Sequence, residues 1–370
     1  MTDRPVIGPG KYFGREQQLR SLMTGIGTGR SFVVVGGPKI GRTSTLLQLS
    51  HANHLASRRD PKAARVVPVS LDLGALAAPS GRGLLTGLYA AVCKAVLDPR
   101  LFGKSKPVRP PELTLARNED PWEKLTATLE ELWHALEGTP AWCRYFLLVD
   151  RGDQFLTPGL EADLQPFATL IKTGAAWAPR AAVVASGRAL REQLLESSAA
   201  LGFARPVFLG TLKESEATAL ISAPFEAVEE ELVIDLIAES GKHPYLLQLL
   251  LAEHERQRFD TTTERVAAAI RPAMIELFEA VWRELDLGRG VTYRGAYAAP
   301  EHALLQHLIE CGAPVDLKTA ERDLGIKPLR EFAELLEYCG VVERVLVGDT
   351  TCFRAPGRLW NSWYSARVRQ

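Results

Sequence analysis

The sequence lacks a long hydrophobic run and an apolar segment at its start. Its longest apolar stretches, such as 146–149 and 181–185, are far shorter than the roughly 20 residues that a membrane-spanning helix needs. The first residues, Met1-Thr2-Asp3-Arg4-Pro5, do not have the composition of a secretory signal. We therefore expect a cytoplasmic protein that has no membrane partner.

The sequence also lacks a surplus of either charge and any close pair of cysteines. It has 44 Lys and Arg against 44 Asp and Glu, so net charge gives no argument for a nucleic-acid partner. The five cysteines are scattered, which excludes a metal-like pairing and favours a reducing compartment; they are Cys93, Cys143, Cys311, Cys339 and Cys352. With 370 residues, 46% of them hydrophobic, the chain is long enough for two or three globular domains.

What the sequence does contain is a glycine-bounded loop between a strand and a helix. Residues 31–36 form an apolar strand pattern, and a helix is expected from Thr43 to about Ala56. The loop nearly matches the phosphate-binding pattern G-x-x-x-x-G-K-[ST]; it reads Gly36-Gly37-Pro38-Lys39-Ile40-Gly41-Arg42-Thr43-Ser44. Glycine lets backbone N–H groups turn toward phosphate oxygens, and the positive end of the helix favours the same anion. The loop therefore predicts nucleotide binding, with the Thr43 hydroxyl serving Mg²⁺.

One position departs from that pattern, because Arg42 stands where the lysine is expected. Arginine keeps the positive charge, but its guanidinium is longer, planar and forked, so it pairs with phosphate in a different place. We expect binding to survive and hydrolysis to suffer. The alternative interpretation is an ordinary glycine-containing turn of an α/β protein.

A second apolar strand, 145–149, ends at Asp150. In a phosphate-loop protein a carboxylate at this place holds the Mg²⁺ shell. The next residue is usually a glutamate that polarises the attacking water, but here it is Arg151, which stays protonated and does not act as a base. Asp153 is the nearest alternative catalytic carboxylate. A buried strand that simply emerges into a polar turn remains the other interpretation.

Two further turns carry candidate residues. The strand 181–185 leads into Ser186-Gly187-Arg188, where the arginine is a candidate sensor of a γ-phosphate, although a solvated turn explains it nearly as well. The turn Gly241-Lys242-His243-Pro244-Tyr245 suits the end of one helix and the first turn of the next. Its histidine is a candidate contact to nucleotide.

Strands that alternate with helices predict an α/β fold with a parallel sheet covered on both faces. Strands are expected at 31–36, 65–73, 145–149, 181–185 and 207–209, and helices within 11–30 and at 43–56, 83–97, 122–136, 161–172 and 190–196. The proline-rich segment 98–121 is interpreted as a surface insertion.

The pattern after Gly210 changes to helices. They are expected at 214–223, 229–240, 243–258 and 263–285, followed by a linker at 288–299, helices at 301–311, 317–324 and 329–338, and a hairpin at 341–347 and 351–353. Three helices and a hairpin are typical of a winged helix. The predicted domains are therefore a P-loop NTPase core (1–210), a helical lid with linker (211–298) and a winged helix (299–370).

Taken in order along the chain, these motifs resemble a known family. They are Phe13-Gly14-Arg15-Glu16, the phosphate loop, Asp150, Arg188 and the turn 241–244. The series is similar to the STAND branch of the AAA+-related P-loop ATPases, close to archaeal and bacterial ATPases with a winged helix after the lid. The resemblance covers roughly residues 11–365. Its Walker A and Walker B motifs are degenerate, because Arg42 and Arg151 replace lysine and glutamate.

The resemblance implies a role for each matching position. Tyr12, Phe13, Gly14 and Arg15 would line the adenine or ribose, Gly36 to Ser44 would hold the phosphates of ATP or ADP, Thr43 and Asp150 would serve Mg²⁺, Arg188 would act as a sensor, and His243 and Pro244 would contact nucleotide from the lid. Such proteins are usually molecular switches, in which ADP holds a closed monomer and ATP opens the lid and permits assembly. Protein partners, with effector or sensor on separate chains, and self-association are implied too.

DNA is a less favoured partner of the winged helix. Residues 300–370 hold nine Lys and Arg against ten Asp and Glu, and the presumed recognition helix 329–338 carries Glu331, Glu334 and Glu337 against Arg330 alone. DNA-binding modules need a cationic face. The leading hypothesis, which rests on the resemblance, is a nucleotide-controlled regulatory switch in the cytoplasm of a prokaryote, with weak or absent hydrolysis. The alternatives are an AAA+-like ATPase that acts on DNA through its winged helix, and a scaffold that has lost nucleotide binding.

Overall fold

The computed structural model of this chain describes residues 12–59, 66–76, 80–102, 106–139, 143–187, 200–224, 228–257, 263–285, 291–293, 296–298 and 300–368. The chain divides into two compact units. We call Glu16–Val35 with Arg42–Val207 the sheet unit. We call Gly36–Gly41 and Phe208–Gln370, with the segment that ends at Arg15, the helical unit. Each unit is described by itself.

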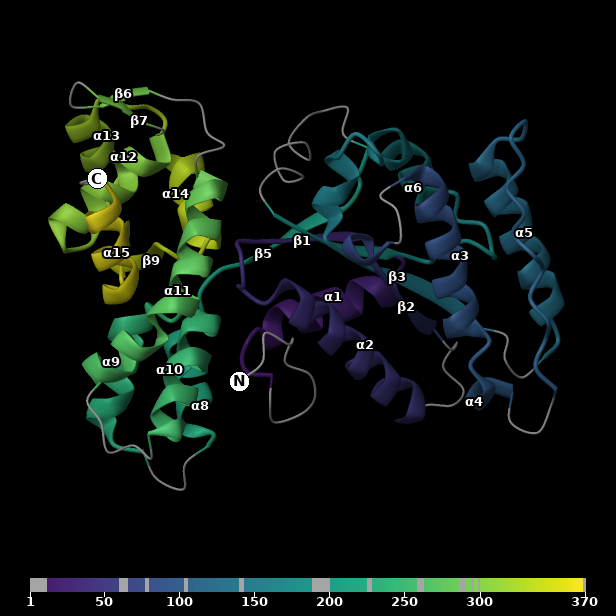
Figure 1. Cartoon of the computed structure of the whole chain (residues 1–370), viewed down its shortest axis with the longest axis horizontal. Helices are drawn as coiled ribbons and strands as arrows, with labels where there is room; N and C mark the ends of the chain where they lie inside the picture. The colour runs from purple at the N-terminus through teal and green to yellow at the C-terminus, as the bar shows by residue number, and fades with distance from the viewer. Residues whose placement is uncertain are drawn as a thin grey trace. The chain divides into compact units, whose positions relative to one another are not determined.

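A five-stranded sheet is the centre of the sheet unit (Figure 1). Its strands are β1 (Phe32–Gly36), β2 (Val66–Asp72), β3 (Arg144–Asp150), β4 (Ala182–Ser186) and β5 (Arg205–Leu209), in the order β2-β3-β4-β1-β5. The pairings β2–β3, β3–β4 and β1–β4 are parallel. Every residue of β1 and β4 is buried, as continuous apolar runs predict for strands covered on both faces. The predicted parallel α/β fold is confirmed.

Helices cover this sheet, and their ends follow the capping residues. They are α1 (Glu16–Gly27), α2 (Arg42–Arg59), α3 (Gly81–Val96), α4 (Pro99–Phe102), α5 (Pro121–Leu136) and α6 (Leu164–Lys172), with 3₁₀ turns η1 (Leu73–Ala75), η2 (Gly152–Leu156) and η3 (Glu161–Asp163). The side chain of Ser80 accepts from the Gly83 N–H at the start of α3, and Asp120 caps α5 just before its first-turn proline. The helix expected at 190–196 lies outside the described residues.

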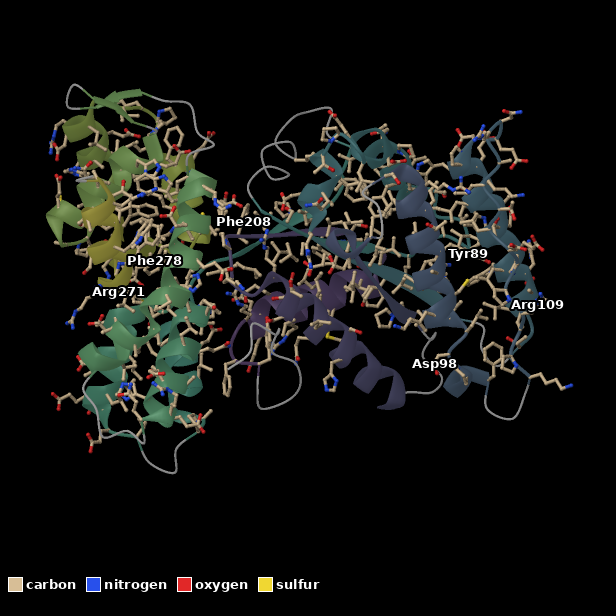
Figure 2. All side chains as sticks on the ribbon, viewed as in Figure 1. Tyr89, Asp98, Arg109, Phe208, Arg271 and Phe278 are labelled. Atoms are coloured by element: carbon tan, nitrogen blue, oxygen red, sulfur yellow. The ribbon has the colours of Figure 1, made fainter. Side chains whose placement is uncertain are left out.

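The expected surface insertion at 98–121 contributes to the core. Phe102, at the end of the short helix α4, is 1% exposed. The Tyr89 hydroxyl of α3, labelled in Figure 2, donates to the carbonyl of Pro111 over 2.7 Å. The prolines correctly indicated irregular backbone, but the apolar side chain of Phe102 was overlooked as an anchor for this segment.

The helical unit begins with four helices, as the sequence predicts. They are α8 (Glu214–Ser222), α9 (Glu230–Ser240), α10 (Pro244–Arg256) and α11 (Thr263–Leu285). The expected linker at 288–299 is wrong in part, because β6 (Val291–Tyr293) and β7 (Ala296–Ala298) form an antiparallel hairpin. β-branched and aromatic residues favour strand, and they outweigh the glycines on which the linker interpretation depended.

The remaining elements have the order of a winged helix. They are α12 (Pro300–Cys311), β8 (Val315–Asp316), α13 (Leu317–Leu324), α14 (Arg330–Tyr338), β9 (Glu343–Val347) and β10 (Thr350–Arg354), followed by α15 (Arg358–Val368). The three strands form one sheet in the order β8-β10-β9. The short strand β8 and the terminal helix α15 were not predicted.

Aromatic side chains fix α15 to the rest of the helical unit. Trp360 and Tyr364 are 3% and 1% exposed, and Phe278 of α11, labelled in Figure 2, meets the Trp360 ring edge-on at 5.0 Å. The aromatic side chains of α15 are therefore packed within the helical unit. No described helix has the length and hydropathy that crossing a membrane requires.

Candidate nucleotide-binding site

In the sheet unit, the two predicted magnesium residues lie in direct contact. The Oγ1 hydroxyl of Thr43, in the first turn of α2, donates to Oδ2 of Asp150, at the end of β3, over 2.7 Å. Among the described residues, no group of three or more His, Cys, Asp or Glu side chains is arranged to hold a metal alone. The Thr43 hydroxyl and the Asp150 carboxylate are oxygen ligands of the kind that Mg²⁺ takes, and this ion uses one or two protein ligands and completes its shell with water and phosphate oxygens.

Arg151, which follows Asp150, is held by a carboxylate of the neighbouring strand. Its Nη2 lies 3.1 Å from Oδ2 of Asp72, and its backbone has a left-handed φ of 55°. Asp72 stands opposite Asp150 in the sheet register, and its other oxygen accepts from the Gly74 N–H over 2.9 Å. Sequence reasoning missed Asp72. The available signal was a second apolar strand that ends in an acid.

The alternative catalytic carboxylate, Asp153, connects three parts of the sheet unit. Its Oδ2 accepts from the Gly187 N–H, after β4, over 2.5 Å and lies 3.6 Å from Nη1 of Arg42. The guanidinium at the lysine position is therefore paired with a carboxylate of the same unit. The candidate sensor Arg188 lies outside the described residues.

The first part of the phosphate loop, Gly36 to Gly41, belongs to the helical unit. Lys39 and Gly41 have left-handed φ angles of 56° and 105°. A Cβ atom at Gly41 would have open space around it, so its φ alone explains the preference for glycine there. The Lys39 Nζ lies 5.3 Å from the centre of the Tyr245 ring.

Arg15 of the entry motif lies against this loop and is 5% exposed. Its Nη2 donates to the carbonyls of Ile40, over 2.7 Å, and of Gly210, over 2.8 Å. The Arg15 N–H donates to Glu216 of α8 over 2.8 Å. Burial lowers the pKa of Arg15 from its ordinary value, and the charge of Glu216 opposes that shift. Arg15 thus supports the loop backbone, while Tyr12, Phe13 and Gly14 lead into it.

The end of helix α14 also packs on the phosphate loop. The Gly37 N–H donates to the Tyr338 carbonyl over 3.0 Å, and a Cβ atom at Gly37 would lie 2.7 Å from Cα of Cys339. A Cβ atom at Gly340 would lie 2.8 Å from Cδ1 of Ile40. Gly37 therefore permits the close approach of a backbone about 300 positions away in the chain, and Gly340 leaves room for the Ile40 side chain. No local pattern in the sequence signals this contact.

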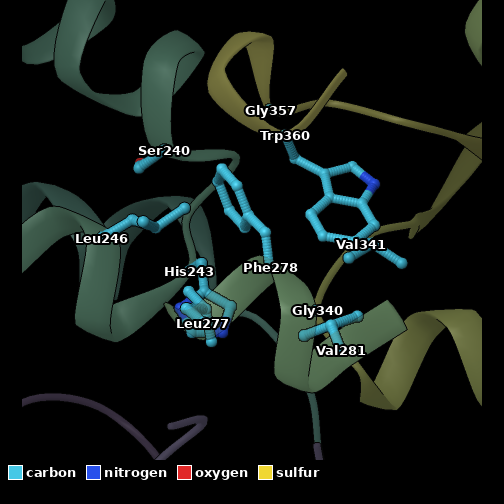
Figure 3. A pocket seen from close by; sticks show the side chains of 10 residues that line it. All are labelled: Ser240, His243, Leu246, Leu277, Phe278, Val281, Gly340, Val341, Gly357 and Trp360. Atoms are coloured by element: carbon cyan, nitrogen blue, oxygen red, sulfur yellow. The ribbon is translucent and has the colours of Figure 1, made fainter. Parts of the chain in front are cut away.

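His243, the lid candidate, packs beside the same glycine. A Cβ atom at Gly340 would lie 2.9 Å from its Cδ2, and the imidazole is 3% exposed. Figure 3 shows it in a small pocket that Phe278 and Trp360 also line. Burial, assisted by the charge of Arg15, lowers the pKa of His243 to about 3. The backbone of Pro38 opposes this lowering of the pKa. Neither ring nitrogen of His243 makes a hydrogen bond of ordinary geometry with the described residues.

The buried imidazole predicts a pH dependence of stability. In the unfolded chain His243 takes up a proton below its ordinary pKa of 6.5, whereas the folded chain keeps it neutral down to about 3. Its contribution to the free energy of unfolding is therefore complete above pH 6.5 and is lost as pH falls from 6.5 toward 3, by about 1.4 kcal/mol per pH unit.

Urea unfolding at pH 7 and pH 5 measures this effect. We expect the wild-type chain to lose about 2 kcal/mol more between the two pH values than the His243→Leu variant, which has no group to protonate at that position. The comparison cancels all other titrating groups. Equal losses in both chains would show that His243 is accessible to protons in the folded state.

Comparison with known proteins adds to this geometry. No family model matches the sequence, and a search of curated proteins finds no match. Among solved structures, a Walker-type ATPase of Pyrococcus abyssi is similar over 98% of this chain and 99% of its own, with 15% identity and a TM-score of 0.60. The ADP form of the ORC2 protein of Aeropyrum pernix is similar over 100% of this chain and 98% of its own, with 14% identity and a TM-score of 0.50.

At these identities the likeness shows the fold alone. The chain therefore shares the α/β fold of these two proteins, with a five-stranded sheet covered by helices and with helical and winged-helix elements after it.

Proposed function

We propose that this protein is an ATP- or ADP-binding regulatory switch of the STAND type with weak or absent hydrolysis. The observation that carries the proposal is the hydrogen bond between the Gly37 N–H of the phosphate loop and the Tyr338 carbonyl of the winged helix. A ligand that changes the loop backbone changes this contact, so binding would bias the docking of the winged helix. The predicted domain boundaries, after residues 210 and 298, belong to this proposal.

The proposed ligand contacts follow the loop and the strand ends. The backbone and side chains from Gly36 to Ser44 would hold the phosphates, and Thr43 with Asp150 would hold Mg²⁺, which supplies charge neutralisation at the phosphates when bound. The segment from Tyr12 to Arg15 would lie beside the adenine or ribose. His243 and Pro244 would respond to the nucleotide through the loop. The His243 imidazole and the Ile40 side chain of the loop both pack near Gly340, so a movement of the loop would reach the imidazole.

Weak hydrolysis follows from the groups around Asp150. Arg151 stands at the position of the water-polarising glutamate and is paired with Asp72. The remaining carboxylate, Asp153, accepts from Gly187 and pairs with Arg42. We infer that no carboxylate described here is placed as a general base for water.

A protein-docking role for the winged helix suits its contacts better than DNA reading. On α14, Glu334 lies 3.1 Å from Arg330, and Glu337 lies 2.7 Å from Arg344 of β9. The carboxylates therefore neutralise Arg330, the cation of that helix, and Arg344 of β9, and the last residues of α14 are occupied by the phosphate loop. Partners on separate chains would dock when this contact opens.

Restoring both Walker residues is expected to raise turnover. A positioned general base contributes a factor of roughly 10² to 10⁴ to a rate. We expect the Arg42→Lys and Arg151→Glu double variant to release phosphate from ATP at least tenfold faster than the wild type. The Arg42→Lys variant alone, which lacks the new base, is the matched control and is expected to change little. If the double variant releases phosphate no faster than the wild type, the slow hydrolysis is not caused by Arg42 and Arg151.

The direct test of the proposal is to denature purified protein and identify by chromatography any nucleotide that it carried. Retained ADP or ATP, with little phosphate release on adding ATP and Mg²⁺, is the expected result. An absence of nucleotide, together with no calorimetric binding of added ATP or ADP, would contradict it and leave a scaffold.

A further inference from the structure

Four neighbouring strands of the sheet unit each begin beside an arginine. Arg144 and Arg205 are the first residues of β3 and β5. Arg180 and Arg30 precede the first residues of β4 and β1 by two positions. These strands are adjacent in the order β3-β4-β1-β5, and parallel neighbours lie about 4.8 Å apart. We call these four residues the strand-start arginine row.

Backbone hydrogen bonds fix the alignment of this row. The Arg180 N–H donates to the Tyr145 carbonyl, next to Arg144, over 2.7 Å. The Arg205 N–H donates to the carbonyl of Ser31, which follows Arg30, over 3.0 Å. The row therefore lies along the edge of the sheet where the strands start. Thr43 and Asp150 lie at the other edge, where parallel strands end, so the row is separate from the candidate magnesium site.

The arginine row lines two adjoining surface hollows that also contain other cations. Arg30 and Arg205 line both hollows. The first hollow adds Arg20, and the second adds Arg144, Lys172 and Arg180. No carboxylate side chain is among the described residues that line either hollow. Six cations are thus concentrated here in a chain whose formal net charge is zero.

Helix ends explain only part of this charge. Helices α1 and α6 end at this edge, at Gly27 and Lys172, and Nη2 of Arg180 donates to the Gly27 carbonyl. Each helix C-terminus is equivalent to about −0.5 elementary charge, so the two offset about one of the six cations. Nε of Arg144 is buried and has no hydrogen-bond partner in the described part of the chain. No carboxylate among the described lining residues offsets the remaining positive charge, which favours a polyanion.

The side chains of the hollows favour nucleic acid among polyanions. Five of the six cations are arginine, whose forked guanidinium pairs with phosphate through two hydrogen bonds. Phe203, which lines the second hollow, is 37% exposed, and the centre of its ring lies 4.6 Å from Nζ of Lys172. A cationic groove with an exposed aromatic ring is the usual arrangement for single strands, whose bases stack on the ring.

We propose that the strand-start arginine row binds the phosphate backbone of single-stranded nucleic acid. This site does not involve the winged helix and does not depend on nucleotide binding at the phosphate loop. The affinity falls with salt, because each phosphate contact releases counterions; about four contacts give a slope of log K against log salt of roughly −3.

Fluorescence anisotropy with a labelled oligothymidine and the full chain tests the proposal. We expect the Arg30→Glu and Arg205→Glu double variant to bind at least tenfold more weakly, with a salt slope reduced in magnitude by about 1.4. The matched control reverses Arg82 and Arg117, two exposed arginines of the same unit outside the hollows, and is expected to retain affinity. The milder Arg30→Gln and Arg205→Gln variant, checked by circular dichroism, separates lost binding from lost folding.

Three outcomes would overturn the proposal. One is an absence of binding by the wild type at low salt. Another is an equal loss of affinity in the row variant and in the control variant, which would indicate a general charge effect. The third is tighter binding of an acidic peptide such as polyglutamate, with displacement of the oligonucleotide, which would assign the hollows to an acidic protein segment.

Discussion

Replacing Asp150 with asparagine is expected to lower the affinity for ATP in the presence of Mg²⁺ by at least tenfold. The carboxylate is the charged group at the end of β3 that contacts Thr43, over 2.7 Å. Asparagine keeps an acceptor for the Thr43 hydroxyl, so the local structure is retained, but the negative charge that attracts the cation is lost. Interactions with charged groups are worth roughly 1.5–3 kcal/mol, and 1.4 kcal/mol corresponds to tenfold.

Calorimetric titration with ATP, with Mg²⁺ and then with a chelator, measures this change. The matched control is Asp72→Asn, because Asp72 stands opposite Asp150 in the register but is bound to Arg151 and Gly74. We expect the control to bind Mg²⁺ and ATP nearly as the wild type does, and the two variants to agree without Mg²⁺. An equal loss of ATP affinity in both variants would show that Asp150 has no particular role in binding Mg²⁺.

Replacing Gly37 with alanine is expected to separate the winged helix from the phosphate loop. The new Cβ atom would lie 2.7 Å from Cα of Cys339, a backbone atom that does not rotate away. Gly37 has no left-handed φ, so alanine causes no strain of its own. Overpacking of this kind costs roughly 1–3 kcal/mol, which shifts the docking equilibrium by roughly 5- to 150-fold.

Cysteine alkylation, followed by mass spectrometry, reports the separation. Cys339 is 0% exposed, whereas Cys311 is exposed and serves as the reference in the same chain. We expect Cys339 of Gly37→Ala to react about tenfold faster relative to Cys311. Gly27→Ala is the matched control, because a Cβ atom there meets nothing within 4 Å. Unchanged reactivity of Cys339 in Gly37→Ala would show that the contact does not hold the winged helix.

The sequence predicted what depends on local patterns. The apolar strand that ends at Asp150 and the glycine-bounded loop before Thr43 each have a composition typical of one local structure. Once the strands are parallel, the two segments meet at the same edge of the sheet, where the Thr43 hydroxyl donates to Asp150. The helices from α8 to α14 follow from apolar spacing in the same way. The hairpin β6–β7 was missed because its glycines were weighed more than its β-branched and aromatic residues.

What the sequence did not predict depends on contacts between distant segments. The bond from Gly37 to Tyr338, the support of Ile40 by Arg15 and the pair of Arg151 with Asp72 each join residues 25 to about 300 positions apart. No period or motif records such pairs. The same is true of the strand-start arginine row, whose members are scattered in the sequence and are aligned only by the strand order.

The measurement that tests the switch most directly is the alkylation rate of Cys339, relative to Cys311, with saturating ADP and with saturating ATP and Mg²⁺. Binding of each nucleotide is first established by calorimetry on the same sample. The account predicts slow reaction with ADP and a several-fold faster reaction with ATP, because ATP opens the contact between the phosphate loop and the winged helix. Equal rates with both bound nucleotides would contradict it.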